Sequence, residues 1–182
     1  MSLTQLNTEQ LIAKCREQNQ NAQLEIYNRY YKAMYNTALR ILKDTAEAED
    51  IMQESFLIAF TKLSMLEDNA VFGAWLKRIV INLSLTTSRK KDVYKEVALE
   101  TIEYALTDSD GIADEDLVST KADTILNTLM QLRDSYSTAL SLHLIEGYDY
   151  EEICQIMNIS YSNCRTLISR AKESLRKKLQ FV

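Results

Sequence analysis

The chain of 182 residues lacks proline, and it has only three glycines, one histidine and three cysteines. Proline and glycine mark the turns between short strands, so their scarcity argues against an all-β fold. A single histidine cannot build a metal site or a hydrolytic triad, and the three cysteines are far apart and form no CxxC pair. We therefore expect no disulfide framework, no metal, no cofactor and no enzymatic activity.

Long apolar runs are also missing. No stretch approaches the roughly 18 apolar residues that a membrane-spanning helix needs. A signal peptide has a basic region followed by an apolar one, and the N-terminus, MSLTQLNTEQ, has neither. The sequence therefore predicts a cytoplasmic protein that does not insert into a membrane.

What the chain does have is helical patterning and an uneven charge. It is 46% hydrophobic and 26% charged, which predicts a buried core, and the apolar spacing is helical throughout. The net charge is −5, yet residues 96–118 carry eight acidic and no basic side chains, whereas residues 161–182 carry six basic and one acidic. Because local charge governs contact with phosphates, the overall acidity does not argue against nucleic-acid binding by the C-terminal end.

The stretch Tyr148–Gln180 has the pattern of a helix-turn-helix. Asp149 and Glu152 can form a capping box at the start of a first helix. A three-residue break, 158–160, ends with Ser160, a good N-cap for a second and longer helix. A short helix, a tight turn and a longer helix are typical of DNA-binding proteins.

The second of these helices separates into two faces at about 100° per residue. The apolar face is expected to pack inward and carries Cys164, Ile168, Ala171 and Leu175. The opposite arc is small, polar and cationic and carries Ser162, Arg165, Thr166, Ser169, Arg170 and Arg176. Such an arc suits the major groove and its phosphates, and an ordinary solvated face remains the alternative.

The N-terminal half predicts helices over about 5–20, 22–42, 44–66 and 72–91. In the third, one stripe is apolar and is expected to be buried: Ala48, Ile51, Met52, Ser55, Phe56, Ala59 and Leu63. The other face is acidic and carries Glu47, Asp50, Gln53 and Glu54. That face is either solvated or docks on a basic partner, and its residues alone do not decide between the two.

The helix at 72–91 combines a buried side with a possible base-binding stripe. The expected buried side consists of Phe72, Leu76, Ile79 and Leu83. About 90° round the helix lie Trp75, Arg78, Asn82 and Arg89, and Lys90 and Lys91 extend the stripe. An aromatic ring beside amide and cationic donors suits unpaired bases and phosphates, although a core position for Trp75 is the commoner arrangement.

These patterns predict an all-α protein of two small helical domains. The first covers residues 1–95, and residues 96–118 form a flexible acidic linker. The second covers residues 119–182 and begins with two helices whose apolar residues are Ala122, Ile125, Leu126 and Leu129 in one and Tyr136, Ala139, Leu140 and Leu144 in the other.

Three motifs, in this order, resemble the small sigma factors of bacterial RNA polymerase. They are AEDIMQESFLIAF, FGAWLKRIVINL and EGYDYEEICQIMNISYSNCRTLISRAKESLRKKL. The resemblance is to the extracytoplasmic-function (ECF) group of the sigma-70 family, and it covers about residues 20–91 and 125–179.

The resemblance implies that the first domain is a region 2 helical bundle and the second a region 4 helix-turn-helix. The core-polymerase-binding residues would be Asp50, Gln53 and Glu54, docking on the clamp helices of the largest subunit. Recognition and melting of the −10 element would fall to the loop 66–71 and to Trp75, Arg78, Asn82, Arg89 and Lys90. The −35 element would be read by Ser162, Arg165, Thr166, Ser169 and Arg170. Promoter DNA, the flap of the second-largest polymerase subunit and an anti-sigma factor are the other implied partners.

Three positions depart from the family pattern. Thr86 stands where an acidic residue is usual, Leu167 where a second basic residue is usual, and Arg133 where proline is usual. The first two put the base preference in question. The competing prediction is a stand-alone helix-turn-helix transcription regulator that binds DNA without polymerase. A helical adaptor resembling an anti-sigma factor is a further alternative, and a helical-bundle enzyme is the weakest.

Overall fold

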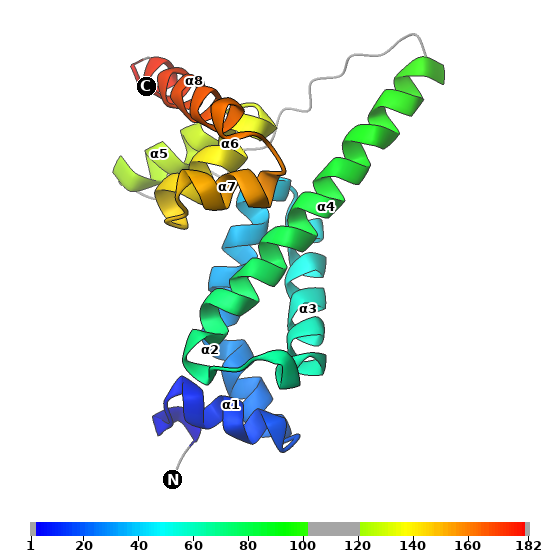
Figure 1. Cartoon of the computed structure of the whole chain (residues 1–182), viewed down its shortest axis with the longest axis vertical. Helices are drawn as coiled ribbons and strands as arrows, with labels where there is room; N and C mark the ends of the chain where they lie inside the picture. Colours follow the sequence, from blue (N-terminus) through cyan, green and yellow to red (C-terminus); the bar gives the residue numbers. More distant parts are fainter. Residues whose placement is uncertain (1–2, 102–120, 181–182) are drawn as a thin grey trace, which may run out of the picture. The chain divides into compact units, whose positions relative to one another are not determined.

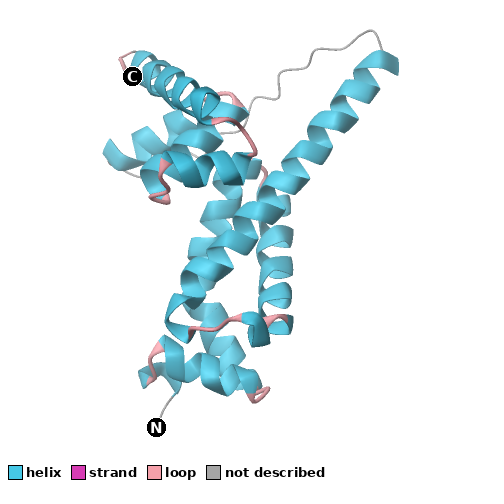
Figure 2. Cartoon of the chain, in the orientation of Figure 1, coloured by secondary structure: helices cyan, strands magenta, loops and turns pink. Residues whose placement is uncertain are grey.

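The computed structural model describes residues 3–101 and 121–180, and within these ranges every regular element is a helix (Figures 1 and 2). The chain divides into two compact units, Met1–Thr87 and Ser88–Val182. The boundary between the units falls inside one long helix. In the two described ranges, no helix combines the length and the apolar character needed to cross a membrane.

The first unit is a helical bundle joined by short 3₁₀ turns. Its elements are η1 (Leu3–Gln5), α1 (Thr8–Arg16), α2 (Gln20–Leu42), α3 (Thr45–Thr61), η2 (Leu63–Met65), η3 (Asn69–Val71) and the first half of α4 (Phe72–Thr101). Polar side chains define where the helices begin. Asn7 forms a capping box with Gln10, and Asn19 and Asp44 accept backbone hydrogen bonds at the starts of α2 and α3.

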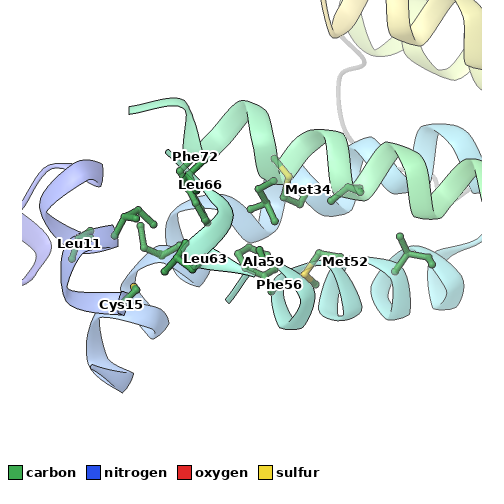
Figure 3. Packing of buried hydrophobic residues seen from close by; sticks show 14 of the residues in the cluster. Leu11, Cys15, Met34, Met52, Phe56, Ala59, Leu63, Leu66 and Phe72 are labelled. Carbon is green, nitrogen blue, oxygen red and sulfur yellow. The ribbon is translucent and has the colours of Figure 1, made fainter. Parts of the chain in front are cut away.

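One apolar core holds this unit together, and it draws on all four helices (Figure 3). Labelled members are Leu11, Cys15, Met34, Met52, Phe56, Ala59, Leu63, Leu66 and Phe72. Burying such side chains stabilises a fold by roughly 1.5–3 kcal/mol for each large aliphatic or aromatic group. The core therefore fixes α1, the turns after α3 and the start of α4 as one body.

Tyr30 of α2 locks the start of α4. Its ring meets Phe72 edge-on, with ring centroids 5.6 Å apart. Its hydroxyl lies 3.3 Å from the hydroxyl of Thr8. A side-chain carbon on Gly73 would lie only 2.9 Å from the Tyr30 ring, so this close approach requires glycine. The loop that ends at Phe72 is thereby held from the α2 side.

The second unit is built around α8. Its helices are α5 (Lys121–Met130), α6 (Asp134–Leu140), the π-helical turn η4 (Ser141–Ile145), α7 (Tyr150–Met157) and α8 (Tyr161–Leu179). Helix α8 packs on α5, α6 and α7. Its predicted apolar face is buried throughout, because Cys164, Ile168, Ala171 and Leu175 are all at most 8% exposed.

Several predicted details of the first unit were wrong. The N-terminal helix ends at Arg16, and α3 ends at Thr61, where the chain tightens into η2. Helix α4 runs to Thr101, so residues 96–101 of the predicted linker are helical, and residues 102–120 lie outside the described residues. Of the predicted buried side of α4, Ile79 and Leu83 are only half-buried, and Val80 is buried instead.

In the second unit the π-helical turn changes which residues face inward. It adds a residue to the turn after α6, so Leu142 is fully buried, while Leu144, one of the apolar residues named for this helix from the sequence, is 53% exposed. In α5 only Leu129 of the four predicted apolar positions is buried, and Ile125 is 44% exposed. Gly147 ends the turn with a φ of +81°, a conformation that favours glycine.

Candidate functional site

The helix-turn-helix forms by the capping signals read from the sequence. Asp149 and Glu152 make both hydrogen bonds of a capping box, at 2.8 and 2.9 Å. Asn158 adopts the left-handed conformation that ends α7, and the N–H of Ile159 donates to Cys154 O, as in a typical helix C-cap. The Ser160 hydroxyl accepts from Asn163 N at 3.3 Å and so begins α8. These local bonds set the direction in which α8 leaves the turn.

The outer face of α8 brings all five residues predicted for −35 recognition together. Ser162, Arg165, Thr166, Ser169 and Arg170 are exposed and line one open hollow. The face presents two guanidinium groups among small hydroxyl side chains. Guanidinium groups donate to guanine edges and phosphates, and small side chains let the helix approach bases closely.

Sequence reasoning missed Tyr161 at the rim of this hollow. Its side chain is 51% exposed, lines the hollow and meets the ring of Tyr150 at 6.3 Å between centroids. Tyr150 in turn lies 5.1 Å from the ring of His143. Its position could have indicated this, because Tyr161 directly follows the N-cap Ser160 and is the first residue of the helix expected to enter the groove.

The predicted stripe on α4 is exposed apart from Trp75, for which a core position was the commoner expectation. Arg78, Asn82 and Arg89 are exposed, whereas Trp75 is half-buried, with its ring 6.1 Å from that of Phe72. Trp75 thus contributes to the core and leaves only part of its indole available. Lys90 is exposed as well, although it lies about 100° round the helix from Arg89.

Thr86 takes part in a local bond. Its hydroxyl donates to Asn82 O, one turn back in α4, at 2.8 Å. A carboxylate, which is usual at this position in the resembled family, could not make that bond because it has no proton to donate. The exposed surface around Asn82 therefore lacks a negative charge at this point.

The loop between α3 and α4 is tightly tied. Asp68 Oδ1 accepts from Ala70 N at 2.8 Å and starts the turn η3. Leu66 is buried in the core, at 5% exposed. The guanidinium of Arg16 donates to Leu66 O and, at 3.1 Å, to Asn69 Oδ1. The loop predicted to read the −10 element is thus fixed at both ends.

The acidic face of α3 is exposed as predicted. Asp50, Gln53 and Glu54 all face solvent, and all three are within one turn of each other. Sequence reasoning missed Leu57, which continues the same face and is 69% exposed. Leu57 adds one apolar side chain to a face that is otherwise acidic and polar. It was overlooked because it lies inside the apolar run FLIAF.

Two of the cysteines are buried, and the histidine lies against a backbone carbonyl. Burial raises the pKa of the Cys15 thiol to about 11. Burial, and then the neighbouring Cys154, raises the pKa of Cys164 to about 11. His143 Nδ1 lies 3.1 Å from Tyr148 O. In the described parts of the chain, no three His, Cys, Asp or Glu side chains are grouped closely enough to hold a metal ion.

Comparison with known proteins assigns both units to families. Residues 26–93 match the family model "Sigma-70 region 2", and residues 122–175 match "Sigma-70, region 4". The ECF RNA polymerase sigma factor SigW of Bacillus subtilis is 33% identical over 177 residues, which cover 93% of this chain and 95% of SigW. This chain belongs to the ECF group of the sigma-70 family.

Other sigma factors agree with this assignment. The RNA polymerase sigma-H factor of Pseudomonas aeruginosa is 29% identical, covering 98% of this chain and 96% of its own length. Among solved structures, the sigma factor RpoE, in complex with the anti-sigma factor NepR from Bartonella quintana, has a TM-score of 0.62 at 20% identity. CnrH in complex with the cytosolic domain of CnrY has a TM-score of 0.55 at 21% identity. They cover 86% and 95% of this ECF chain, and 95% and 97% of their own, and share its all-α fold.

Proposed function

We propose that this ECF sigma factor binds core RNA polymerase and directs it to promoters with separate −10 and −35 elements. Residues 1–95 would act as region 2 and residues 119–182 as region 4, with residues 96–118 joining them. The observation that carries the proposal is the face of α8, where the five predicted residues share one exposed hollow while the opposite seam is buried. A sigma factor of this kind acts in the cytoplasm, without a catalytic residue of its own.

The exposed face of α8 would contact the −35 element. Arg165 and Arg170 would donate to base edges or phosphates, and Ser162, Thr166 and Ser169 would border the contact. The Thr166 hydroxyl already donates to Ser162 O at 3.0 Å, which leaves its oxygen free to accept from a base or a water. Tyr161 would lie at the edge of the contact.

The −10 element would be held by residues of the 1–95 domain after it melts. We propose that the loop 66–71 and the α4 residues Trp75, Arg78, Asn82, Arg89 and Lys90 bind flipped bases of the non-template strand. Binding only the unpaired state shifts the equilibrium toward open DNA by the difference in affinity, so no chemistry is required. The half-buried Trp75 would offer a ring edge rather than a full stacking face.

Polymerase would dock on the face of α3. Asp50, Gln53 and Glu54 would meet the clamp helices of the largest subunit, and the exposed Leu57, one turn further along α3, would add an apolar contact. Region 4 would contact the flap of the second-largest subunit. An anti-sigma factor would compete with polymerase for the chain; the similar sigma factor RpoE is bound by the anti-sigma factor NepR.

Run-off transcription tests the proposal. Purified core polymerase with this chain is expected to start at defined sites of a random promoter library, and core alone to give none of these starts. The selected promoters should share two separated elements. A chain that yields no specific starts, or that binds an operator stably without core, would instead be a stand-alone regulator.

A further inference from the structure

The N-terminal helix α1 is tied to the loop between α3 and α4 by one arginine. Arg16 uses a single terminal nitrogen, Nη2, to donate to Leu66 O and to Asn69 Oδ1, the latter at 3.1 Å. Asn69 Nδ2 returns the contact by donating to Glu9 O at 3.5 Å. The three bonds join parts of the chain that are 50 to 60 residues apart in sequence.

These contacts add to the Asp68 cap in holding the exposed middle of the loop. Leu66 at the start of the loop is held by the core, and Phe72 at its end is held by Tyr30. Between them Glu67, Asp68 and Ala70 are exposed, and the turn depends on the cap from Asp68 to Ala70 N. Arg16 and Asn69 supply the side-chain bonds that connect this exposed middle to a helix.

We propose that Arg16 is a positioning residue for −10 recognition: it holds the loop 66–71 in the shape that discriminates the bound base. This inference rests on the proposed function, because it assumes that the loop reads the −10 element. Two bonds from one planar group restrict both position and orientation, and base discrimination requires groups fixed to a fraction of an ångström. Arg16 itself need not touch DNA.

A direct phosphate contact by Arg16 is the competing explanation, and it has a different signature. Losing a phosphate contact weakens binding uniformly across sequences and lowers the salt slope by about one. Losing a positioning residue weakens the preferred base more than the others and leaves the salt slope unchanged. The two explanations are therefore separable in one titration series.

Arg29 provides a matched control. It is also an exposed arginine of unit 1 that donates to backbone carbonyls, at 2.8 Å to Leu6 O and 3.1 Å to Thr4 O. It also pairs with Glu25 at 2.8 Å. Arg29→Ala removes the same side chain and the same charge as Arg16→Ala, but it loosens the N-terminal segment and not the loop.

The first measurement uses the free chain and does not depend on polymerase. Hydrogen exchange at the N–H groups of Ala70 and Val71, which both donate to Asp68, reports the order of the loop. Arg16→Ala is expected to speed their exchange about tenfold, which corresponds to about 1.4 kcal/mol of local stability. Arg29→Ala should leave it unchanged. Unchanged exchange in Arg16→Ala would overturn the inference whatever the polymerase assays show.

The second measurement is open-complex formation by the holoenzyme on four promoters that differ only at the −10 base most strongly selected by the wild type. Arg16→Ala should reduce the ratio between the preferred and the other bases about tenfold, with an unchanged salt slope, and Arg16→Lys should restore part of it. In an Asn69→Ala background, Arg16→Ala should have a smaller effect than it has alone, because their shared bond is already lost and only the Arg16 bond to Leu66 O remains.

The possible results distinguish a failure of the positioning role from a failure of the proposed function. An equal loss on all four promoters, or an equal loss in Arg29→Ala, would overturn the positioning role. If Arg16→Ala does not fold, Arg16→Lys carries the same comparison, and a ratio identical to wild type would contradict the inference. A wild-type holoenzyme that shows no −10 preference would overturn both the inference and the proposed function, even if the exchange result holds.

Discussion

Gly73→Ala tests the packing that supports the start of α4. The new Cβ would lie 2.9 Å from Tyr30 Cε1, 3.4 Å from its Oη and 3.5 Å from its Cζ. The ring cannot retreat freely, because it packs edge-on against Phe72 and its hydroxyl lies 3.3 Å from that of Thr8. Overpacking of this kind destabilises a fold by about 1–3 kcal/mol. The better helix propensity of alanine offsets up to about 1 kcal/mol.

The expected net loss is about 1–2 kcal/mol, which lowers Tm by about 4–16 °C for a unit of this size. The single tryptophan of the chain, Trp75, lies in this unit 6.1 Å from Phe72, so its fluorescence reports the relevant transition. In a Tyr30→Leu background the same Gly73→Ala change should cost less than about 0.5 kcal/mol, since the obstructing ring edge is gone. An equal cost in both backgrounds would refute the reasoning.

Three further predictions concern the surfaces and the buried thiol. Leu57→Ala should weaken core-polymerase association about tenfold in a fluorescence-anisotropy titration, while Met65→Ala, which removes an equally exposed side chain from outside that face, should not. Arg165→Ala should weaken holoenzyme binding to −35 promoters about tenfold and relax base preference there, and Lys177→Ala, an equal charge loss at a residue paired with Glu173, should not relax it. The pKa of Cys164 is raised to about 11 in the folded chain, so the folded state keeps this proton at a pH where the unfolded state has lost it. The stability that this thiol contributes should therefore be lost as pH rises from about 9 to 11. Cys164→Ala should flatten the plot of urea midpoint against pH over that range. A profile of the same slope in both proteins would contradict the buried-thiol assignment.

The helix-turn-helix was predictable because its determinants are local. The capping box at Asp149, the break at Asn158 and the N-cap Ser160 each act within four residues, and the buried face of α8 follows from the spacing of its own apolar residues. The exposed face of α8, including Arg165 and Arg170, could therefore be predicted from the sequence alone. The all-α architecture followed for the same reason.

The errors arose where tertiary packing overrides periodicity. In α2 the residues Tyr27, Tyr31, Met34, Ala38 and Ile41 step by three and four, which predicts burial, yet Tyr31 is 44% exposed, because its ring stacks on Tyr27 at the edge of the core rather than entering it. Leu144 faces out because the π-helical turn adds a residue, and no sequence signal marks that turn. The bonds of Arg16 to Leu66 and Asn69 span about 50 residues and are invisible to any local pattern.

The central claim is that the two DNA-reading surfaces act together only on polymerase. Its most direct test is the affinity of the chain for one selected promoter, measured with and without core enzyme at the same salt concentration. We predict specific binding that responds to changes in both elements when core is present, and only weak, sequence-independent binding by the chain alone. Tight, sequence-specific binding by the chain without core would contradict it.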